Sequence, residues 1–330
     1  DMFRISNVGI VTSKDAVLIA NSKEELENQI LENYNEFDVS FINIISYRPF
    51  DKRFIYYDDK KLERARKEVM EHFLNNKNNI GLVCDRGTKL QDISNIFISD
   101  KLIDLHLVGS GSYIFPLYIY DTENVRKILR EENEEVGGMF EDIKHFENKV
   151  RIENFTPKFR KFINEKYGEI KPEEILGYIY AILFHKEYRK KYFDFLKIDF
   201  PKIPFVESKD YFLKFAKLGE ELYNLHLENL KIQKEVGEPM FKDNKNKNEK
   251  IVKAIYNENE KDLFVNESLY FKNVDKEVWE YKIGGYQVLD KYLKSHKNEN
   301  IDYEHFENVI KILARSIEIE AEISKLGLSL

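Results

Sequence analysis

The sequence feature that most constrains the fold is a proline placed between two stretches of strand-like sequence. The apolar run 39–45 leads into Tyr47-Arg48-Pro49-Phe50, and alternating aromatic residues follow at 54–57. Proline has no amide hydrogen, and it disfavours a helical conformation for the residue before it. The chain should therefore stay extended at Arg48, and the sequence predicts two strands that meet in a bend at Arg48-Pro49.

Two arginines accompany this bend. We expect it to present Arg48 and Arg53 from a sheet that is crowded with aromatic rings. A guanidinium group is planar and carries several donors, so this arrangement suits a contact with phosphate or with the edge of guanine. The simpler alternative is an edge strand whose arginines are solvated.

The rest of the chain separates into a strand-rich part and a helical part. Up to residue 130, strand-like runs lie at 8–12, 16–20, 80–84, 95–98, 102–108 and 113–120, and helices are predicted at 23–36, 60–75 and 121–130. From 149 onward apolar residues recur at helical spacing behind the capping residues Thr156, Ser208 and Asp302. The sequence predicts an α+β fold: a β-rich half (1–130) with flanking helices, then a mainly helical half (149–330) that carries a small antiparallel meander at 250–272.

Charge is distributed unevenly along the chain. The net charge is −7, yet 131–147 alone holds seven acidic residues and one lysine. An acidic loop can lie away from a nucleic acid while basic side chains gather on another face. We therefore interpret 131–148 as an acidic spacer between the two halves, and the overall charge predicts modest intrinsic affinity for a polyanion.

The basic residues most suited to a recognition surface are on loops. Arg86 and Lys89 follow the buried strand predicted at 80–84, in a loop that contains a glycine. A loop can vary its side chains while the sheet below it stays fixed. Lys14, in a polar turn between two predicted strands, is either a phosphate contact or simply exposed.

A glycine pair marks a second candidate contact. Gly284 and Gly285 lie between Lys282 and Tyr286, just before a helix predicted to begin at 287. Backbone N–H groups at a helix start can bind phosphate. A tight turn required by packing is the alternative. The basic run 186–191 likewise has two interpretations, a phosphate contact or a solvated face.

Several kinds of chemistry have no residues to support them. The sequence contains neither a glycine-rich loop for S-adenosylmethionine nor a Pro-Pro-aromatic loop to hold a flipped base, and it lacks a phosphate-binding G-x-x-x-x-G-K-[ST] loop. The single Cys84 excludes a disulfide framework or a zinc cluster and fits a reducing cytosol. No apolar run approaches 18 residues and no secretory leader opens the sequence, so we expect a cytoplasmic protein without a membrane span. The missing motifs predict that this chain is not catalytic by itself. Because strand-like sequence follows directly after Asp1, we also expect a piece of a longer protein.

Four longer words carry a family resemblance. They are RPFDKRFIYYD (48–58), GSYIFPLYIY (111–120), ILGYIYAILFHKEYRKKYFDFLKIDFPKIPF (175–205) and VWEYKIGGYQVLDKYLK (278–294). In this order they resemble the C-terminal specificity domain of type ISP and related single-chain type IIG restriction–modification enzymes. The resemblance implies a target recognition domain that reads duplex DNA for an adenine methyltransferase and a nuclease in the same polypeptide.

The resemblance also implies the partners and the division of labour. The partners would be double-stranded DNA and the methyltransferase domain of the same polypeptide, with no membrane. This chain would hold no cofactor, whereas the parent would use S-adenosylmethionine and Mg²⁺, with ATP if it carries a translocase. The β-rich half would read bases through Arg48, Arg53, Arg86 and Lys89, and the helical half would clamp the backbone through Lys282, Gly284, Gly285 and Tyr286.

A different class of function is also compatible with the residues. In a protein-interaction scaffold the aromatic strands would pack on the methyltransferase domain without reading bases, and the arginines would form ion pairs. The acidic overall charge favours this alternative.

Overall fold

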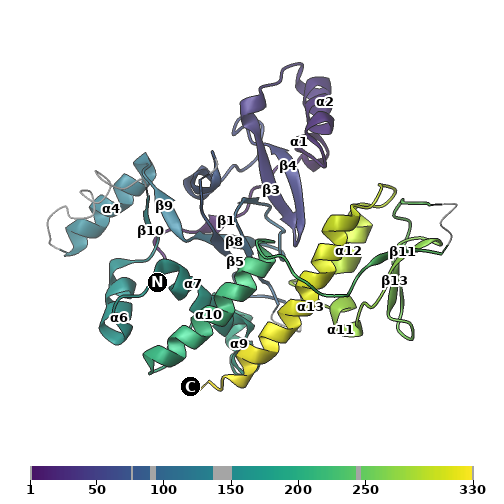
Figure 1. Ribbon diagram of the computed structural model, residues 1–330. Coiled ribbons are helices and arrows are strands. Elements are labelled where there is room, and N and C mark those ends of the chain that lie inside the picture. The colour runs from purple at the N-terminus through teal and green to yellow at the C-terminus, as the bar shows by residue number, and fades with distance from the viewer. Residues whose placement is uncertain (1, 76, 90–93, 137–150, 243–246, 329–330) are drawn as a thin grey trace.

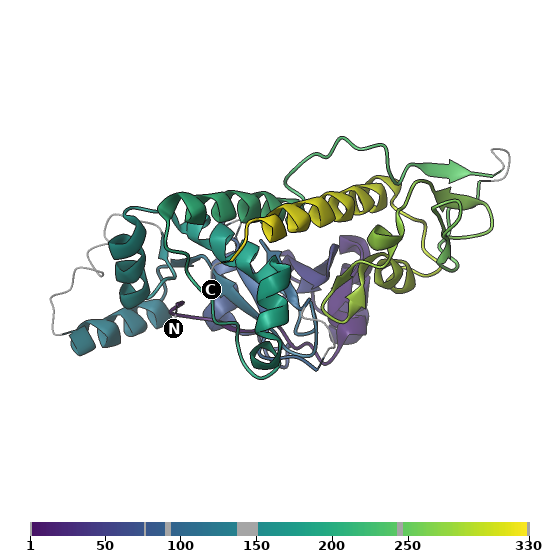
Figure 2. The ribbon, with the colours of Figure 1, turned by 90° about the horizontal axis from the view of Figure 1, so that it is seen from below.

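Five small β-sheets and a group of packed helices make up the part of the chain that the structure describes. The computed structural model describes residues 2–75, 77–89, 94–136, 151–242 and 247–328. The predicted α+β class is confirmed. Long helices run along one side of the molecule and the sheets of the first half lie behind them (Figures 1 and 2).

Two four-stranded sheets form the centre of the first half. One has the order β1 (Asn7–Val8), β8 (Ser112–Pro116), β5 (Gly81–Asp85) and β6 (Ile96–Ser99), with every pair antiparallel. The other has the order β2 (Ile19–Ala20), β4 (Asp51–Tyr56), β3 (Ile42–Arg48) and β7 (Leu102–Ile103), in which β3 and β7 are parallel. The two strands predicted on either side of Arg48-Pro49 are therefore present, as β3 and β4.

The first half also contains short helical segments. They are α1 (Asp15–Leu18), α2 (Lys23–Tyr34), η1 (Val39–Phe41), α3 (Lys67–Met70), η2 (Glu71–Phe73) and α4 (Glu123–Val136). A strand over 16–20 was wrong for all but its last two residues, since Asp15–Leu18 is helical. Of the helix predicted over 60–75, only Lys67–Met70 and Glu71–Phe73 are helical. The first part is not helical, because Asp58 accepts the Lys60 N–H in a turn and Arg66 takes a left-handed backbone conformation (φ 52°) that interrupts a helix.

The second half is mainly helical, as predicted. Its helices are α6 (Pro157–Tyr167), α7 (Pro172–Phe184), α8 (Lys186–Lys191), α9 (Phe193–Leu196), α10 (Lys209–His226), α11 (Lys276–Trp279), α12 (Val288–Ser295) and α13 (Tyr303–Lys325). The predicted caps are confirmed: Thr156, Ser208 and Asp302 each accept a hydrogen bond from a backbone N–H in the first turn. Every residue of α7 from Ile175 onward is buried, so this helix forms the centre of the helical core.

Three smaller sheets complete the fold. The meander predicted at 250–272 is present as the antiparallel strands β12 (Ile255–Asn257), β13 (Asp262–Phe264) and β14 (Leu269–Phe271). A fourth strand that was not predicted, β11 (Pro239–Phe241), pairs with β14, and this sheet lies at one end of the molecule (Figure 1). A second pair joins β9 (Tyr118–Tyr120) to β10 (Arg151–Glu153). The third pair, β15 (Lys282–Ile283) and β16 (Tyr286–Gln287), is a hairpin that turns at the glycine pair.

The two halves share one hydrophobic core. Strand β10 returns to pair with β9 across the predicted spacer, and the rings of Phe50, Phe97 and His226 pack together from β3–β4, β6 and α10. Of the spacer, 131–136 continues α4, and 137–148 lies outside the described residues. Residues before the proposed boundary at 131–148 are therefore in direct contact with residues after it.

Candidate nucleic-acid interface

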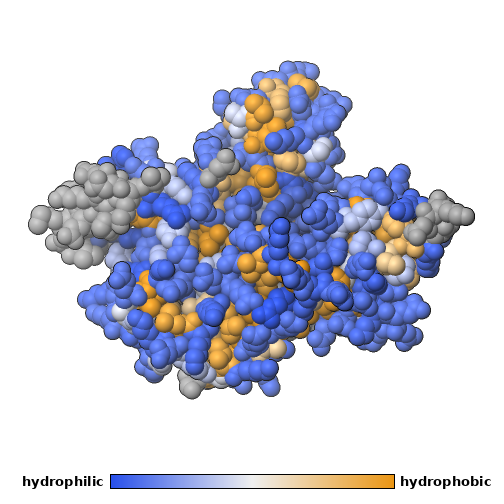
Figure 3. All heavy atoms as spheres, in the orientation of Figure 1, coloured by the Kyte–Doolittle hydropathy of each residue, from blue (hydrophilic) through white to orange (hydrophobic). Residues whose placement is uncertain are grey.

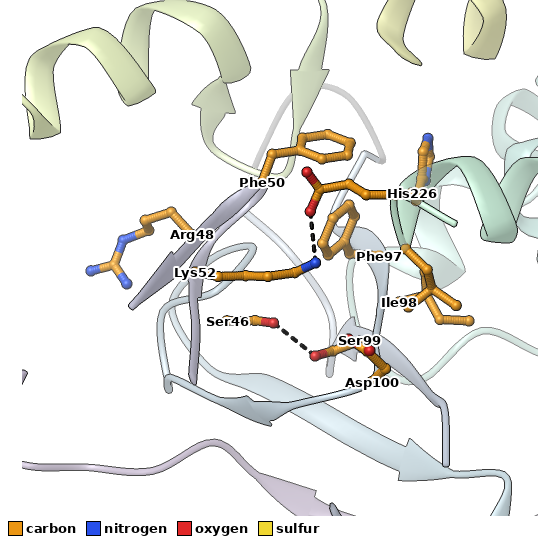
Figure 4. Close-up of a pocket in the computed structure, with 11 residues that line it drawn as sticks. Ser46, Arg48, Phe50, Lys52, Phe97, Ile98, Ser99, Asp100 and His226 are labelled. Atoms are coloured by element: carbon orange, nitrogen blue, oxygen red, sulfur yellow. Dashed lines mark hydrogen bonds and ion pairs between the residues drawn. The ribbon is translucent and has the colours of Figure 1, made fainter. Parts of the chain in front are cut away.

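The bend at Arg48-Pro49 lies inside the protein. Phe50, at its tip, has a left-handed backbone (φ 60°) and is only 2% exposed. Its carbonyl accepts a hydrogen bond from His305 Nε2 at 2.8 Å, and its ring contacts Phe97 and His226 (Figure 4). The expectation that this bend projects outward as a recognition surface was wrong, because the apolar tip is buried against α10 and α13.

A small cavity lies beneath the bend. Its volume is about 10 Å³, enough for one water molecule but far too small for a nucleotide. Lys52 Nζ lies 2.7 Å from Glu228 Oε2, and the Ser46 and Ser99 hydroxyls are 2.8 Å apart (Figure 4). Not every polar atom of the lining is paired, since Arg48 Nε and Asp100 Oδ1 have no hydrogen-bond partner among the described residues. The cavity lies at the seam, by which we mean the contact surface between the β-rich half and the helical half.

Arg48 is held by partners from two other segments. Its side chain is 12% exposed, and Nη1 lies 2.6 Å from Asp104 Oδ1. The guanidinium carbon is 4.1 Å from the centre of the Tyr47 ring and 5.7 Å from that of Tyr286. Burial raises the pKa of Asp104 even though Arg48 opposes that shift, so desolvation outweighs the attraction within the pair.

Arg53 is held in the same way. Its Nε lies 3.0 Å from Asp51 Oδ1 and its Nη2 lies 2.8 Å from Asp51 Oδ2, while the guanidinium stacks 4.3 Å from the centre of the Tyr47 ring. Burial favours a raised pKa for Asp51, but hydrogen bonds from His296 and Arg53 outweigh it and lower the pKa to about 2. Both arginines are largely buried and each is paired with an aspartate, so neither projects into solvent as the sequence led us to expect.

Tyr286 and Lys291 complete a basic–aromatic cluster with Tyr47, Arg48 and Arg53. Lys291 Nζ lies 5.5 Å from the centre of the Tyr286 ring, and Tyr286 Oη donates to the His106 carbonyl at 2.9 Å. Burial, together with the positive charge of Arg48, lowers the pKa of Lys291. The structure thus brings together three predicted residues from opposite halves. Sequence reasoning missed Lys291, because only the docking of the β15–β16 hairpin places it beside Arg48.

The glycine pair is used for packing. Gly284 N–H donates to the Ser94 carbonyl at 2.7 Å and Gly285 N–H donates to the Val108 carbonyl at 3.1 Å. Both donors predicted to bind phosphate are therefore occupied in this structure, which corresponds to the alternative of a tight turn required by packing. Lys282, at the start of β15, is exposed.

Arg86 and Lys89 are the most accessible of the predicted base readers. The Arg86 side chain is 59% exposed and its Nε lies 2.8 Å from Asp199 Oδ1, whose side chain is also more than half exposed. Lys89 is exposed on the same loop. Lys14 is exposed elsewhere, with Nζ 3.4 Å from Tyr34 Oη. An exposed ion pair exchanges readily with solvent, so Arg86 can leave Asp199 for another acceptor.

The surface also bears an open apolar patch. Ile44 of β3 is 40% exposed and pairs across the sheet with Phe54 of β4, and Val39 is 70% exposed just before β3. Figure 3 shows apolar side chains gathered over the lobe of β3 and β4, within a surface that is mostly hydrophilic. Helix α2 begins beside the same face, since Lys23 Nζ lies 5.7 Å from the centre of the Phe54 ring, and its Leu26 and Ile30 are buried.

Two histidines at the seam give a pH-dependent prediction. His296 beside Asp51 and His305 beside Glu228 both have raised pKa values, because their carboxylate partners outweigh burial. A histidine with a raised pKa stabilises the fold fully below its unfolded value of 6.5, and this contribution is lost as the pH rises through the folded pKa. We expect the free energy of unfolding to fall as the pH is raised above 6.5.

Urea unfolding at a series of pH values measures this effect. The variant His296→Gln should flatten the decline above pH 6.5, and His106→Gln, on an exposed loop, serves as the control. A His296→Gln protein with the same pH dependence as the unmodified chain would contradict the assignment.

Among the described residues, no helix is both long and apolar enough to span a bilayer, and no three or more His, Cys, Asp or Glu side chains are grouped so as to hold a metal ion. Cys84 is buried in β5, and burial raises the pKa of its thiol. A buried protonated thiol is unreactive, so Cys84 acts here as a small buried side chain of the sheet.

Comparison with known families gives one match, over residues 29–325, to the model described as the type ISP C-terminal specificity domain. No curated protein sequence matches the chain. The four sequence words that carry the resemblance all lie within the matched range.

Solved structures share the fold at low sequence identity. A nuclease-deletion mutant of the type ISP restriction–modification enzyme LlaGI, in complex with a DNA substrate mimic, is 20% identical with a TM-score of 0.70, over 98% of this chain and 33% of that one. The ATP-dependent type ISP enzyme LlaBIII bound to DNA is 19% identical with a TM-score of 0.70, over 99% and 23%. The DrdV–DNA complex is 20% identical with a TM-score of 0.73, over 98% and 35%. The chain therefore spans about a quarter to a third of these neighbours.

Proposed function

Because the chain belongs to the family of type ISP C-terminal specificity domains, we propose that it recognises a specific sequence of duplex DNA. The family match over 29–325 is the observation that carries this proposal. The three similar structures, each of an enzyme with DNA or a DNA mimic, support it.

The geometry favours different roles for the predicted contact residues. Arg86 and Lys89 lie on an exposed loop after a buried strand, so they can reach base edges in a groove. Lys14 and Lys282 are exposed and suit phosphate contacts. Arg48, Arg53 and Tyr286 are engaged at the seam, so we propose that they position the two halves around the DNA. Gly284 and Gly285 would contribute to the same positioning, because their N–H groups bind the Ser94 and Val108 carbonyls across the contact between the two halves.

The context of this recognition is also a proposal. By resemblance, the chain would act within an adenine methyltransferase and endonuclease that uses S-adenosylmethionine and Mg²⁺, with ATP where a translocase is present, in the cytoplasm. The partial coverage of the three neighbours fits a domain within a longer polypeptide. With a net charge of −7, the chain would depend on other parts of such an enzyme for many phosphate contacts.

Arg86→Ala gives the sharpest test of base reading. Loss of a bidentate contact to a base should weaken binding by about 1–3 kcal/mol and relax specificity at one position of the site. Selection of bound duplexes from a randomised pool, followed by sequencing, measures both effects. Arg126→Ala removes an arginine of similar exposure (57%) that is also paired with an aspartate, so it is the matched control. Unchanged specificity in Arg86→Ala would remove this residue from the readers.

One observation supports the alternative function, a scaffold that binds the methyltransferase domain without reading bases. Arg48 and Arg53 form intramolecular ion pairs, as that hypothesis expects. A gel shift of the whole chain on duplex DNA, at low and at moderate salt, separates the two functions. Absence of any shift, together with a stable complex with a methyltransferase domain, would favour the scaffold.

A further inference from the structure

The segment 186–202, between α7 and α10, differs in charge from the rest of the chain. It contains six basic and three acidic residues, a net charge of +3 in a protein whose net charge is −7. Within the described part of the chain, Lys190, Lys191, Lys197 and Lys202 are exposed and form no ion pair. This segment is therefore a local positive surface on an acidic molecule.

The same segment exposes two large apolar side chains. Phe195, in α9, is 72% exposed and Ile198, just after it, is 77% exposed. Between them Leu196 is buried, and the Ile198 N–H donates to the Phe195 carbonyl at 3.0 Å. The buried leucine anchors the turn, so Phe195 and Ile198 are held out into solvent. One turn therefore holds two large apolar side chains in water, and burial of both against a bound molecule would be favourable.

Lysines lie on the same segment as this apolar tip, over the rings that precede it. Lys197 Nζ is 4.2 Å from the centre of the Phe193 ring, and Lys191 Nζ is 5.7 Å from that of Tyr192. The acidic residues of the segment are Glu187, Asp194 and Asp199, and Asp199 is already paired with Arg86. An apolar tip on a segment that carries exposed lysines fits a partner whose interior is apolar and whose edges are anionic.

The apolar tip is also attached to the loop of Arg86. The Thr88 N–H donates to the Lys197 carbonyl at 3.2 Å, and Arg86 is paired with Asp199. Gly87 has a left-handed backbone (φ 72°), and a side chain there would place its first carbon 2.6 Å from the Lys197 carbonyl oxygen. The predicted reading loop and the tip are thus held together by contacts on both sides of Gly87.

From these contacts we infer that Phe195 and Ile198 form a wedge that enters between base pairs of duplex DNA while the surrounding lysines bind phosphates. Apolar side chains that enter a groove and partly unstack a base step, with basic residues beside them, are a known mode of binding. This inference rests on the proposed function, since the DNA that Arg86 reads would be the DNA that the wedge deforms. An acidic protein surface would satisfy the lysines but would not require attachment to a reading loop.

The test uses the whole chain and a duplex first selected from a randomised pool by the unmodified protein. A 2-aminopurine base placed at successive positions reports local unstacking as a rise in fluorescence. With the unmodified protein we expect the fluorescence to rise at positions next to the base pairs whose recognition depends on Arg86. The double variant Phe195→Ala/Ile198→Ala should not produce this rise. Affinity should fall by about tenfold or more, the size expected for failing to bury one large apolar side chain.

A second pair of variants separates the wedge from the charges. Lys190→Ala/Lys191→Ala should reduce the dependence of affinity on salt and keep the fluorescence rise, because these residues would contact phosphate. Val252→Ala/Ile255→Ala removes two other exposed apolar residues (49% and 56% exposed) beside Lys253, and it should change neither readout. All replaced residues are exposed, and urea unfolding checks that each variant is folded.

The outcomes distinguish this inference from the proposed function. If the unmodified chain selects a duplex but Phe195→Ala/Ile198→Ala binds and unstacks it equally well, the wedge is wrong and DNA recognition stands. If that variant keeps DNA binding but loses a complex with a methyltransferase domain, the tip is a protein interface and the wedge is again wrong. If the unmodified chain selects no duplex under any salt condition, the proposed function itself fails.

Discussion

Gly284→Ala should destabilise the chain by about 3–5 kcal/mol, since the added carbon collides with backbone and not with a movable side chain. It would lie 1.5 Å from the Val108 carbonyl oxygen, and the residue has a left-handed backbone (φ 59°). Relief of the clash requires the β15–β16 hairpin to move away from the first half. The hydrogen bonds that Gly284 and Gly285 donate to Ser94 and Val108 would then be lost. Urea unfolding of the purified variant measures the loss.

The neighbouring glycine supplies a matched control. A carbon added at Gly285 would meet nothing within 4 Å. Gly285→Ala should therefore change stability by less than about 0.5 kcal/mol, the usual range for an exposed site. Equal losses at both positions would show that the hairpin does not need its close approach to Val108. If Gly284→Ala folds, weakened DNA binding would support the proposed role of the seam in placing the two halves.

Asp104→Ala should cost about 3–5 kcal/mol, because it leaves the Arg48 guanidinium buried without its counter-ion. The two side chains are 12% and 6% exposed, and the Arg48 Nε is already buried without a hydrogen-bond partner among the described residues. Asp199→Ala breaks an arginine–aspartate pair in which both side chains are more than half exposed, so its cost should stay below about 1 kcal/mol. The contrast is measured by urea unfolding of both variants.

A double variant tests the physical reason. Arg48→Met/Asp104→Leu replaces the whole pair by apolar side chains, so no buried charge is left alone. A buried pair replaced in this way often costs little, and most of the stability lost in Asp104→Ala should return. A double variant as unstable as Asp104→Ala would mean that the pair itself, and not the isolated charge, provides the stabilisation.

These two predictions concern the same part of the molecule. The β15–β16 hairpin, the loop after β7 and the end of β3 meet where Gly284 approaches Val108 and Arg48 binds Asp104. The Arg48–Asp104 pair joins the end of β3 to the loop after β7, and Arg48 also lies 5.7 Å from the centre of the Tyr286 ring in the hairpin. We therefore expect variants of this seam to alter DNA recognition through the placement of the reading loop.

The wedge and the seam also differ in how their variants should behave. Variants of Phe195 and Ile198 should change binding with little change in stability, since both side chains are exposed. Variants of Gly284 and Asp104 should change stability first. This difference allows the contact surface and the supporting structure to be separated by two measurements on each protein.

The sequence by itself determined the local structure and the family. Thr156, Ser208 and Asp302 begin helices because a side-chain oxygen can accept from the first turn, whatever lies nearby. Pro49 separates two strands because its ring fixes the backbone. The four ordered words indicate the specificity domain from their residues alone, and the family match over 29–325 agrees.

Only the tertiary structure decided which of the candidate residues are accessible. Arg48 and Asp104 are 56 residues apart, and Gly284 meets Val108 from the other half of the chain, so no local spacing could pair them. Burial of the bend at Phe50 turned two expected contact arginines into seam residues, and the docking of one hairpin added Lys291 to them. Periodicity and capping depend on near neighbours, whereas burial and ion pairing depend on segments that meet only in the folded chain.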